Sequence, residues 1–164
     1  MGRGRLPEAD DVTRTVSVPA TPIVATVAAC MAALGAAFLP WLTTGEARRS
    51  AFALARSADA LGFIDSPVRR AMVLSWYLLP LLTAAVWTAG ALRQPVAVAA
   101  LAAVVGSMSV AAGSMFMSLA RPGLGPVAAV VAGIVTLAGS VWLAWSVASA
   151  RAATSRMTAE GSRT

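Results

Sequence analysis

Residues 96–120, VAVAALAAVVGSMSVAAGSMFMSLA, form an apolar run without a single charged side chain. About 20 apolar residues in a helix are enough to cross the ~30 Å hydrocarbon core of a bilayer. The run therefore predicts a transmembrane helix. Its small residues recur at steps of four, three and four, which places them on one face of the helix and lets a second backbone approach closely. These residues are Ala102, Gly106, Ser109 and Gly113.

Further apolar runs lie on both sides of this one. Residues 71–92 precede it across only three residues, 93–95, so the two helices must be antiparallel neighbours joined by a tight turn. Residues 127–150 follow it, and an earlier run covers 23–42. The sequence therefore predicts an all-α fold, an antiparallel four-helix transmembrane bundle, with an interfacial helix between the first and second spans.

The fourth run repeats the small-residue face of the third. We predict that these two spans meet through their small faces, because lipid supplies no hydrophobic drive for helix association and close backbone packing must replace it. Pro80 lies inside the second span and predicts a kink, since proline has no N–H for the carbonyl of Trp76. The small residues of the fourth span are Ala129, Gly133, Thr136, Ser140 and Ala144.

The composition is that of an integral membrane protein. Of the 164 residues, 58% are hydrophobic and 12% are charged, and the mean hydropathy is +0.74, which lies outside the range of soluble domains. The formal charge of +6 comes from arginines spread over tails and loops rather than gathered in one patch, which disfavours nucleic-acid binding. We expect one membrane domain, residues 21–150, between disordered tails at 1–20 and 151–164.

Residues 46–70, here called the cap, lie between the first and second spans and carry eight of the twenty charged side chains. From 50 to 62 the pattern is that of an interfacial helix, with leucines on one face and arginine and aspartate on the other. Two phenylalanines fall on the charged face, which predicts that the segment is covered on both sides. We expect the cap to bind a partner or anionic lipid through Glu46, Arg48, Arg49, Phe52, Arg56, Asp59, Phe63, Arg69 and Arg70.

Residues suited to catalysis are scarce. No span contains Asp, Glu, Arg or His, the residues that mark proton relays, ion coupling and substrate sites in membranes. The chain has no histidine, and its one cysteine, Cys30, lies in an apolar run. The three acids of the cap have five arginines as neighbours, which favours salt bridges over acid–base chemistry. We therefore expect no enzyme activity, and no catalytic, cofactor-binding or metal-binding residues.

Four spans place both termini on the same side of the membrane. The terminal side carries seven arginines and the long-loop side six, so the positive-inside rule hardly discriminates. The short turn and the polar tails resemble cytoplasmic segments, and from this we expect cytoplasmic termini. Aromatic belts are predicted on the loop side at Trp41, Trp76 and Tyr77, and on the terminal side at Trp87, Trp142 and Trp145.

One further pattern lies at the end of the first span and in the cap. It consists of Pro40-Trp41, Gly45, Arg49-Ser50, Phe52, Leu54 and Leu61-Gly62. This pattern resembles one in small uncharacterised four-span membrane proteins of actinobacteria. The resemblance covers chiefly residues 38–63 together with the four-span layout. It implies a multi-pass protein of the bacterial cytoplasmic (plasma) membrane and implies no activity.

Two functions are compatible with these features. The first is a non-enzymatic accessory, assembly or scaffold subunit, whose cap docks on a membrane-protein partner, a second copy or anionic lipid. The alternative is a passive channel or small-molecule permeation component, which would use the hydroxyls of Ser107, Ser114 and Ser118 and the kink at Pro80. Such hydroxyls more often bond to the carbonyl one turn back.

Overall fold

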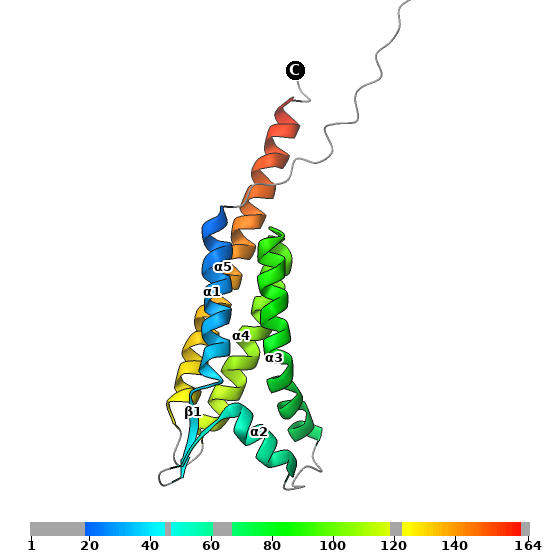
Figure 1. Cartoon of the computed structure of the whole chain (residues 1–164). Helices are drawn as coiled ribbons and strands as arrows, with labels where there is room; N and C mark the ends of the chain where they lie inside the picture. The colour runs from blue at the N-terminus through cyan, green and yellow to red at the C-terminus, as the bar shows by residue number, and fades with distance from the viewer. Residues whose placement is uncertain (1–18, 45–46, 61–66, 119–122, 162–164) are drawn as a thin grey trace, which may run out of the picture.

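The computed structural model describes residues 19–44, 47–60, 67–118 and 123–161, and these are mostly helical. The all-α class predicted from the sequence is confirmed, with one short hairpin added. Figure 1 shows the four longer helices packed side by side, with the hairpin and the shortest helix at one end. In chain order the elements are α1 (Ala20–Ala36), β1 (Pro40–Thr44), β2 (Ala47–Ser50), α2 (Ala51–Ala60), α3 (Pro67–Ala91), α4 (Pro95–Met117) and α5 (Leu124–Gly161).

Three helical segments among the described residues are long and apolar enough to cross a membrane. They are Leu74–Ala91 in α3, Pro95–Met117 in α4 and Leu124–Ala153 in α5. The fourth long helix, α1, is apolar but has only 17 residues, which is the lower limit for a span. Large apolar side chains lie exposed along the outer faces of these helices, as expected of a membrane protein.

The first helix ends earlier than the sequence predicted. The predicted span covered 23–42, whereas α1 ends at Ala36. Pro40 explains the correction, because proline has no N–H for a helical bond and restricts the residue before it to extended conformations. The N–H groups of Phe38 and Leu39 bond to carbonyls only three residues back, which tightens the last turn. The chain then enters the hairpin.

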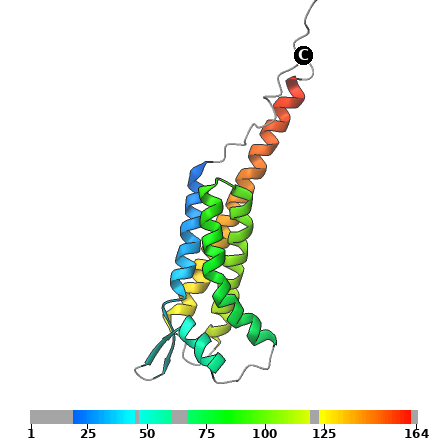
Figure 2. The same cartoon turned by 45° about the vertical axis from the view of Figure 1, so that its right-hand side comes forward.

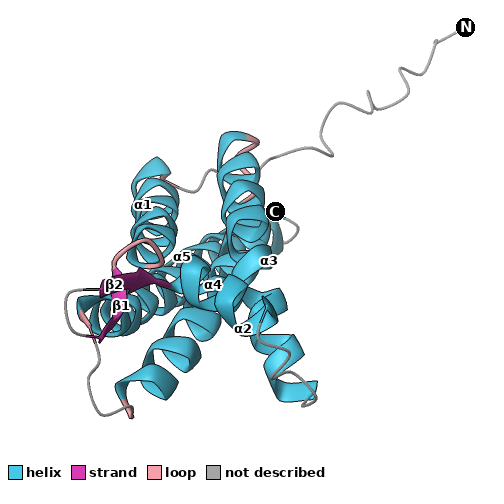
Figure 3. Ribbon diagram, turned by 60° about the horizontal axis from the view of Figure 1, so that its bottom comes forward, coloured by secondary structure: helices cyan, strands magenta, loops and turns pink. Residues whose placement is uncertain are grey.

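The hairpin formed by β1 and β2 was not predicted. Its antiparallel strands pair Leu42 with Arg49 and Thr44 with Ala47, and the register is irregular between Pro40 and Leu42. Residues 45–46, which join the strands, lie outside the described residues. The structure therefore places Arg49 on a strand rather than at the edge of a helix. Figure 3, with this end turned forward, shows the hairpin beside α1 and α2 beside α3.

The contact between α4 and α5 is close enough for the two backbones to touch. A Cβ atom added to Gly133 would lie 2.8 Å from the carbonyl oxygen of Gly106, and one added to Gly106 would lie 2.9 Å from that of Gly133. A Cβ at Gly113 would lie 2.7 Å from the oxygen of Pro126. The predicted packing residues are all buried: Ala102, Gly106, Ser109, Gly113, Ala129, Gly133 and Ser140.

The hydroxyl groups at this contact bond within their own helices. Ser109 donates to the carbonyl of Val105 at 2.9 Å, and Ser140 donates to the carbonyl of Leu137 at 2.7 Å. Thr136, which lies against Cys30 of α1, donates to the carbonyl of Ala132 at 2.8 Å. A hydroxyl satisfied in this way can be buried without the penalty of an unpaired polar group. These small polar residues therefore allow close helix packing without leaving a buried hydroxyl unpaired.

In the turn between α3 and α4, the residue that ends α3 has a left-handed backbone conformation. Arg93 has φ of 52°. The N–H of Arg93 bonds to the carbonyl of Gly90 at 3.0 Å, and that of Gln94 bonds to the carbonyl of Ala89 at 2.9 Å. This pair of bonds is a Schellman motif, which usually has glycine at the left-handed position. An arginine there is strained by about 1 kcal/mol.

The end of α5 corrects a second prediction. Residues 151–164 were expected to be a disordered tail, but α5 continues to Gly161. Arg, Ala and Met make up seven of the fourteen residues from 151 to 164, and they have high helix propensity. Extending an existing helix also avoids the cost of nucleation. Figures 1 and 2 show this last part projecting beyond the other helices. The N-terminal tail at 1–18 lies outside the described residues.

Gly133→Ala should destabilise the fold by about 1–3 kcal/mol, because the added methyl group overlaps backbone that cannot move aside independently. Gly35→Ala is the matched control, since a Cβ there meets nothing within 4 Å and alanine is the better helix former. Thermal unfolding in mild detergent, followed by circular dichroism, compares the two. Equal midpoints for both variants would contradict the close α4–α5 contact.

Arg93→Gly should stabilise the fold by about 0.5–1 kcal/mol, because glycine adopts positive φ without strain. Arg93→Ala removes the same charge and keeps the strained backbone, so it should give no gain. The same thermal unfolding measurement distinguishes them. A gain of similar size in both variants would assign the effect to the arginine charge and contradict the strain at this turn.

Candidate functional site

The indole of Trp41 lies fully buried at the hairpin end of the helices. Its N–H donates to the carbonyl of Ala36 at 2.9 Å. Its ring meets the rings of Trp76 and Phe116 edge to face, with centroids 4.6 Å and 5.1 Å away, a favoured geometry for aromatic pairs. One side chain thus joins the end of α1 to both α3 and α4.

Two glycines at the start of α5 leave the space that Trp41 occupies. A Cβ on Gly125 would overlap the indole of Trp41, and a Cβ on Gly123 would overlap the carbonyl of Pro40. The N–H of Gly123 also donates to the carbonyl of Trp41 at 3.0 Å. The absence of side chains at these two positions is therefore what allows the hairpin to lie against α5.

The helix α2 is attached to the same end of the bundle through Phe52. The ring of Phe52 lies 5.1 Å from that of Phe38 and 6.4 Å from that of Trp76, centroid to centroid. The N–H of Ala51 donates to the carbonyl of Ala37 at 3.2 Å. We call the five rings of Phe38, Trp41, Phe52, Trp76 and Phe116 the aromatic cluster. It connects the cap to the long helices.

The cap residues predicted to bind a partner or lipid fall into three groups. Arg49 and Arg56 are exposed, and Phe52 is half-buried in the aromatic cluster. Arg48 lies on β2, Asp59 on α2, and Arg69 and Arg70 in the first turn of α3. Glu46 and Phe63 lie outside the described residues. Of the predicted set, the structure therefore shows two outward-facing guanidinium groups and one anchoring ring.

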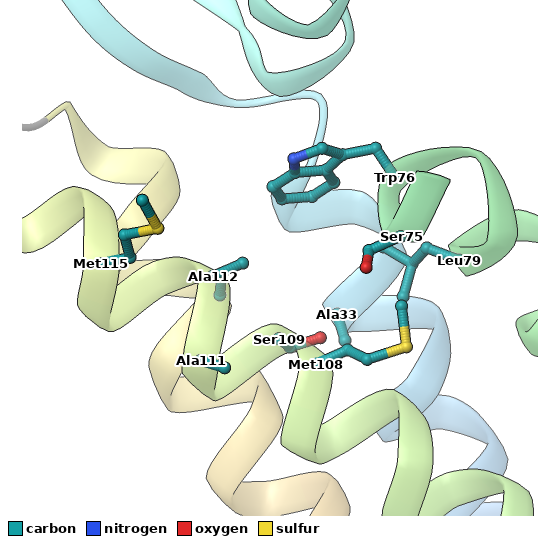
Figure 4. A pocket seen from close by; sticks show the side chains of 10 residues that line it. Ala33, Ser75, Trp76, Leu79, Met108, Ser109, Ala111, Ala112 and Met115 are labelled. Carbon is teal, nitrogen blue, oxygen red and sulfur yellow. The ribbon is translucent and has the colours of Figure 1, made fainter. Parts of the chain in front are cut away.

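A cavity of about 250 Å³ lies beside the aromatic cluster, between α3 and α4. Trp76 belongs to both the cluster and the cavity wall. Figure 4 shows side chains entering it from both helices. Its lining is apolar except for two serines, and the Ser109 hydroxyl already donates to its own helix. The lining residues are Ala33, Ser75, Trp76, Leu79, Met108, Ser109, Ala111, Ala112, Met115 and Ala129.

Further along α3, a second, more open groove of about 520 Å³ lies between α3 and α1. It lies toward the terminal end and is lined only by apolar side chains and glycine, namely Ile23, Val24, Val27, Ala28, Met31, Trp87, Gly90 and Ala91. With a space at each of these two levels, α3 is packed less tightly than α4 and α5. Pro80 lies between the two levels along α3. The first part of α3 diverges from α4 (Figures 1 and 2).

The serines considered as a pore lining, Ser107, Ser114 and Ser118, are exposed on the outer face of α4. Ser118 donates to the carbonyl of Met115 at 2.6 Å. The structure does not bring this stripe to an enclosed path within the single chain. Among the described residues, no group of three or more His, Cys, Asp or Glu side chains lies together as a metal site. Cys30 is fully buried in α1.

Two of the predicted belt residues occupy a different environment. Trp41 and Trp76 are buried, whereas the sequence placed them at lipid head groups. The correction follows from Gly123 and Gly125, which open an internal space that a large ring fills with greater burial than the interface offers. Tyr77, Trp87, Trp142 and Trp145 remain exposed. Nothing in the sequence pattern connects Gly123 and Gly125 with Trp41, so the cluster was not predicted.

No protein-family model, curated protein or solved structure matches this chain. The features of the described residues that bear on function are the aromatic cluster, the exposed arginines of the cap and the cavity.

Trp41→Ala should destabilise the fold by about 3–5 kcal/mol, the usual cost of removing a fully buried large aromatic side chain. Trp145→Ala is the matched control, because Trp145 is 73% exposed and its loss should cost little in detergent. Thermal unfolding in mild detergent gives both values. If the two variants unfold at the same temperature, Trp41 does not join the hairpin to the helices as described.

Proposed function

We propose that α1, α3, α4 and α5 cross a membrane as an antiparallel four-helix transmembrane bundle. The length and apolar surface of three of these helices support this, and α1 packs along α5 for much of its length. A 17-residue helix covers about 25 Å, so α1 spans with modest thinning of the bilayer or with help from flanking residues. The resemblance stated above favours the bacterial cytoplasmic membrane, with both termini in the cytoplasm.

We further propose that the protein is an accessory, assembly or scaffold subunit. The observation that carries this is the cap, which is fixed to the bundle by Phe52 in the aromatic cluster and points Arg49 and Arg56 outward. When a charged surface is already held in place, binding through it costs little conformational entropy. Arginine suits such a surface, because its planar guanidinium pairs with carboxylate in a bidentate geometry. The partner is an acidic surface of another membrane protein or a second copy of the chain.

A passive channel or permeation component is the second candidate, favoured by the exposed stripe of Ser107, Ser114 and Ser118 on α4. Lipid tails offer no hydrogen-bond partners to exposed hydroxyl groups. Around the symmetry axis of an oligomer, the same hydroxyl groups would line a water-filled path. This function therefore requires a symmetric assembly of several copies. It would show as ion or solute flux through liposomes that contain the purified oligomer.

Extraction in mild detergent through a C-terminal tag, followed by native mass spectrometry, tests the accessory role. We expect a complex of fixed stoichiometry with a larger membrane protein, and we expect Arg49→Ala combined with Arg56→Ala to weaken it about tenfold or more. Arg151→Ala combined with Arg156→Ala is the matched control, because it removes two exposed arginines at the other end of the molecule. That control should leave the complex intact.

The contrary results separate the two candidates. A lone monomer from native membranes, or a complex that both double variants weaken equally, would contradict docking through the cap. A homo-oligomer with solute flux would instead support the channel.

A further inference from the structure

We propose that the cavity between α3 and α4 holds one acyl chain of an anionic glycerophospholipid, whose phosphate binds the exposed guanidinium of Arg56. The inference depends on the proposed membrane location, and it assigns to a lipid phosphate the same Arg56 guanidinium that the proposed docking surface presents. Three features support this site: the apolar cavity, the contacts that keep it open, and the exposed arginine on α2.

The cavity has the size and chemistry of a site for an alkyl chain. Apolar cavities of about 150 Å³ in proteins remain dry and bind benzene-sized molecules, and this one has about 250 Å³. Its α4 wall extends from Met108 to Met115, which is about 10 Å along the helix axis. An elongated apolar space that opens between two helices matches part of an acyl chain better than a compact polar ligand.

The walls of the cavity cannot simply collapse together. Trp76 is held in place by its edge-to-face contacts with Trp41 and Phe52. Pro80 lies one residue beyond Leu79 of the wall and interrupts the helical bonding of α3. Four of the lining residues are alanines, which are too short to fill the space: Ala33, Ala111, Ala112 and Ala129. An apolar space kept open in this way gains dispersion contacts when an alkyl chain enters it.

An exposed arginine on α2 favours an anionic head group. Arg56 is exposed and lies four residues after Phe52 on α2, so the two residues are neighbours on the helix surface. Phe52 in turn contacts Trp76 of the cavity wall. The guanidinium of an arginine such as Arg56 binds phosphate strongly and in a bidentate geometry. Neither the cavity nor the groove between α1 and α3 has a charged residue in its lining. The cavity differs because its wall includes Trp76, whose ring contacts Phe52, one helical turn from Arg56.

Photo-crosslinking of the full-length purified chain in phosphatidylcholine vesicles tests the proposal. The probe is phosphatidylglycerol with a diazirine on one acyl chain, and a phosphatidylcholine with the same diazirine chain is the comparison. Peptide mapping by mass spectrometry should place the phosphatidylglycerol label mainly on α3 between Ser75 and Leu79 and on α4 between Met108 and Met115. The zwitterionic probe should label these segments about fivefold less.

Two variants separate the acyl chain from the head group. Ala112→Phe fills the cavity and should remove most of the label from its walls, whereas Ala28→Phe, which fills the other groove, should leave that label unchanged. Arg56→Gln changes an exposed side chain without altering packing, and it should make the two lipid probes label equally. Circular dichroism melting shows whether each variant is folded, and Arg56→Gln tests the charge even if Ala112→Phe does not fold.

Several outcomes would overturn the proposal. Label spread evenly over all exposed helix faces would mean general lipid contact. Equal labelling of the cavity by both probes in the wild-type chain would rule out selection of anionic lipid. Loss of cavity label when the chain is purified together with a protein partner would mean that a partner helix occupies the space. No label anywhere would contradict the membrane location itself, and so would be distinguishable from failure of the lipid site alone.

Discussion

The enclosure of Trp41 is the constraint on which the hairpin end of this protein depends. Its indole is fully buried, its N–H is bonded to the carbonyl of Ala36, and its ring contacts α3 and α4. Any arrangement that keeps these contacts must end α1 before Pro40 and must leave positions 123 and 125 without side chains. The end of α1, the hairpin and the start of α5 are therefore constrained by where one ring lies. Burial of so large a ring is worth several kcal/mol, enough to overcome its preference for the interface.

The helices are joined by two different kinds of contact. The backbones of α4 and α5 touch through Gly106 and Gly133, so this pair depends on the absence of side chains. The helix α3 depends instead on rings at one end and on the turn at Arg93 at the other, with an apolar space on each side of its middle. Close backbone packing leaves little freedom, because any added volume meets backbone. The space for a ligand lies beside α3 because that helix lacks this kind of contact.

The sequence predicts the long helices and their closest contact well, for a physical reason. The length of an apolar run is set by the thickness of a bilayer. Small residues at steps of three and four must lie on one helix face, so Gly106 and Gly133 could be selected from spacing alone. The aromatic cluster could not be selected in this way. A tryptophan after a proline at the end of an apolar run suits a head-group position just as well as a buried one. Only the contact with Gly123 and Gly125, more than 80 residues away in the chain, distinguishes these environments. The helical end of α5 agrees with the helix propensity of its Arg and Ala residues, although its composition is polar.

The cap and the cavity are physically connected, because Trp76 contributes to both. Its ring contacts Phe52 of the cap on one side and forms part of the cavity wall on the other. Any partner that binds α2 and displaces Phe52 changes the support of Trp76, and any molecule in the cavity presses on the same ring. Thermodynamic linkage requires such effects to be equal in both directions. The size of the effect is limited by how far Trp76 can move, and Trp41, enclosed between α1, α3, α4 and the start of α5, sets that limit. The residue that fixes the fold at this end thus also determines how strongly binding at the cap and occupancy of the cavity can influence each other.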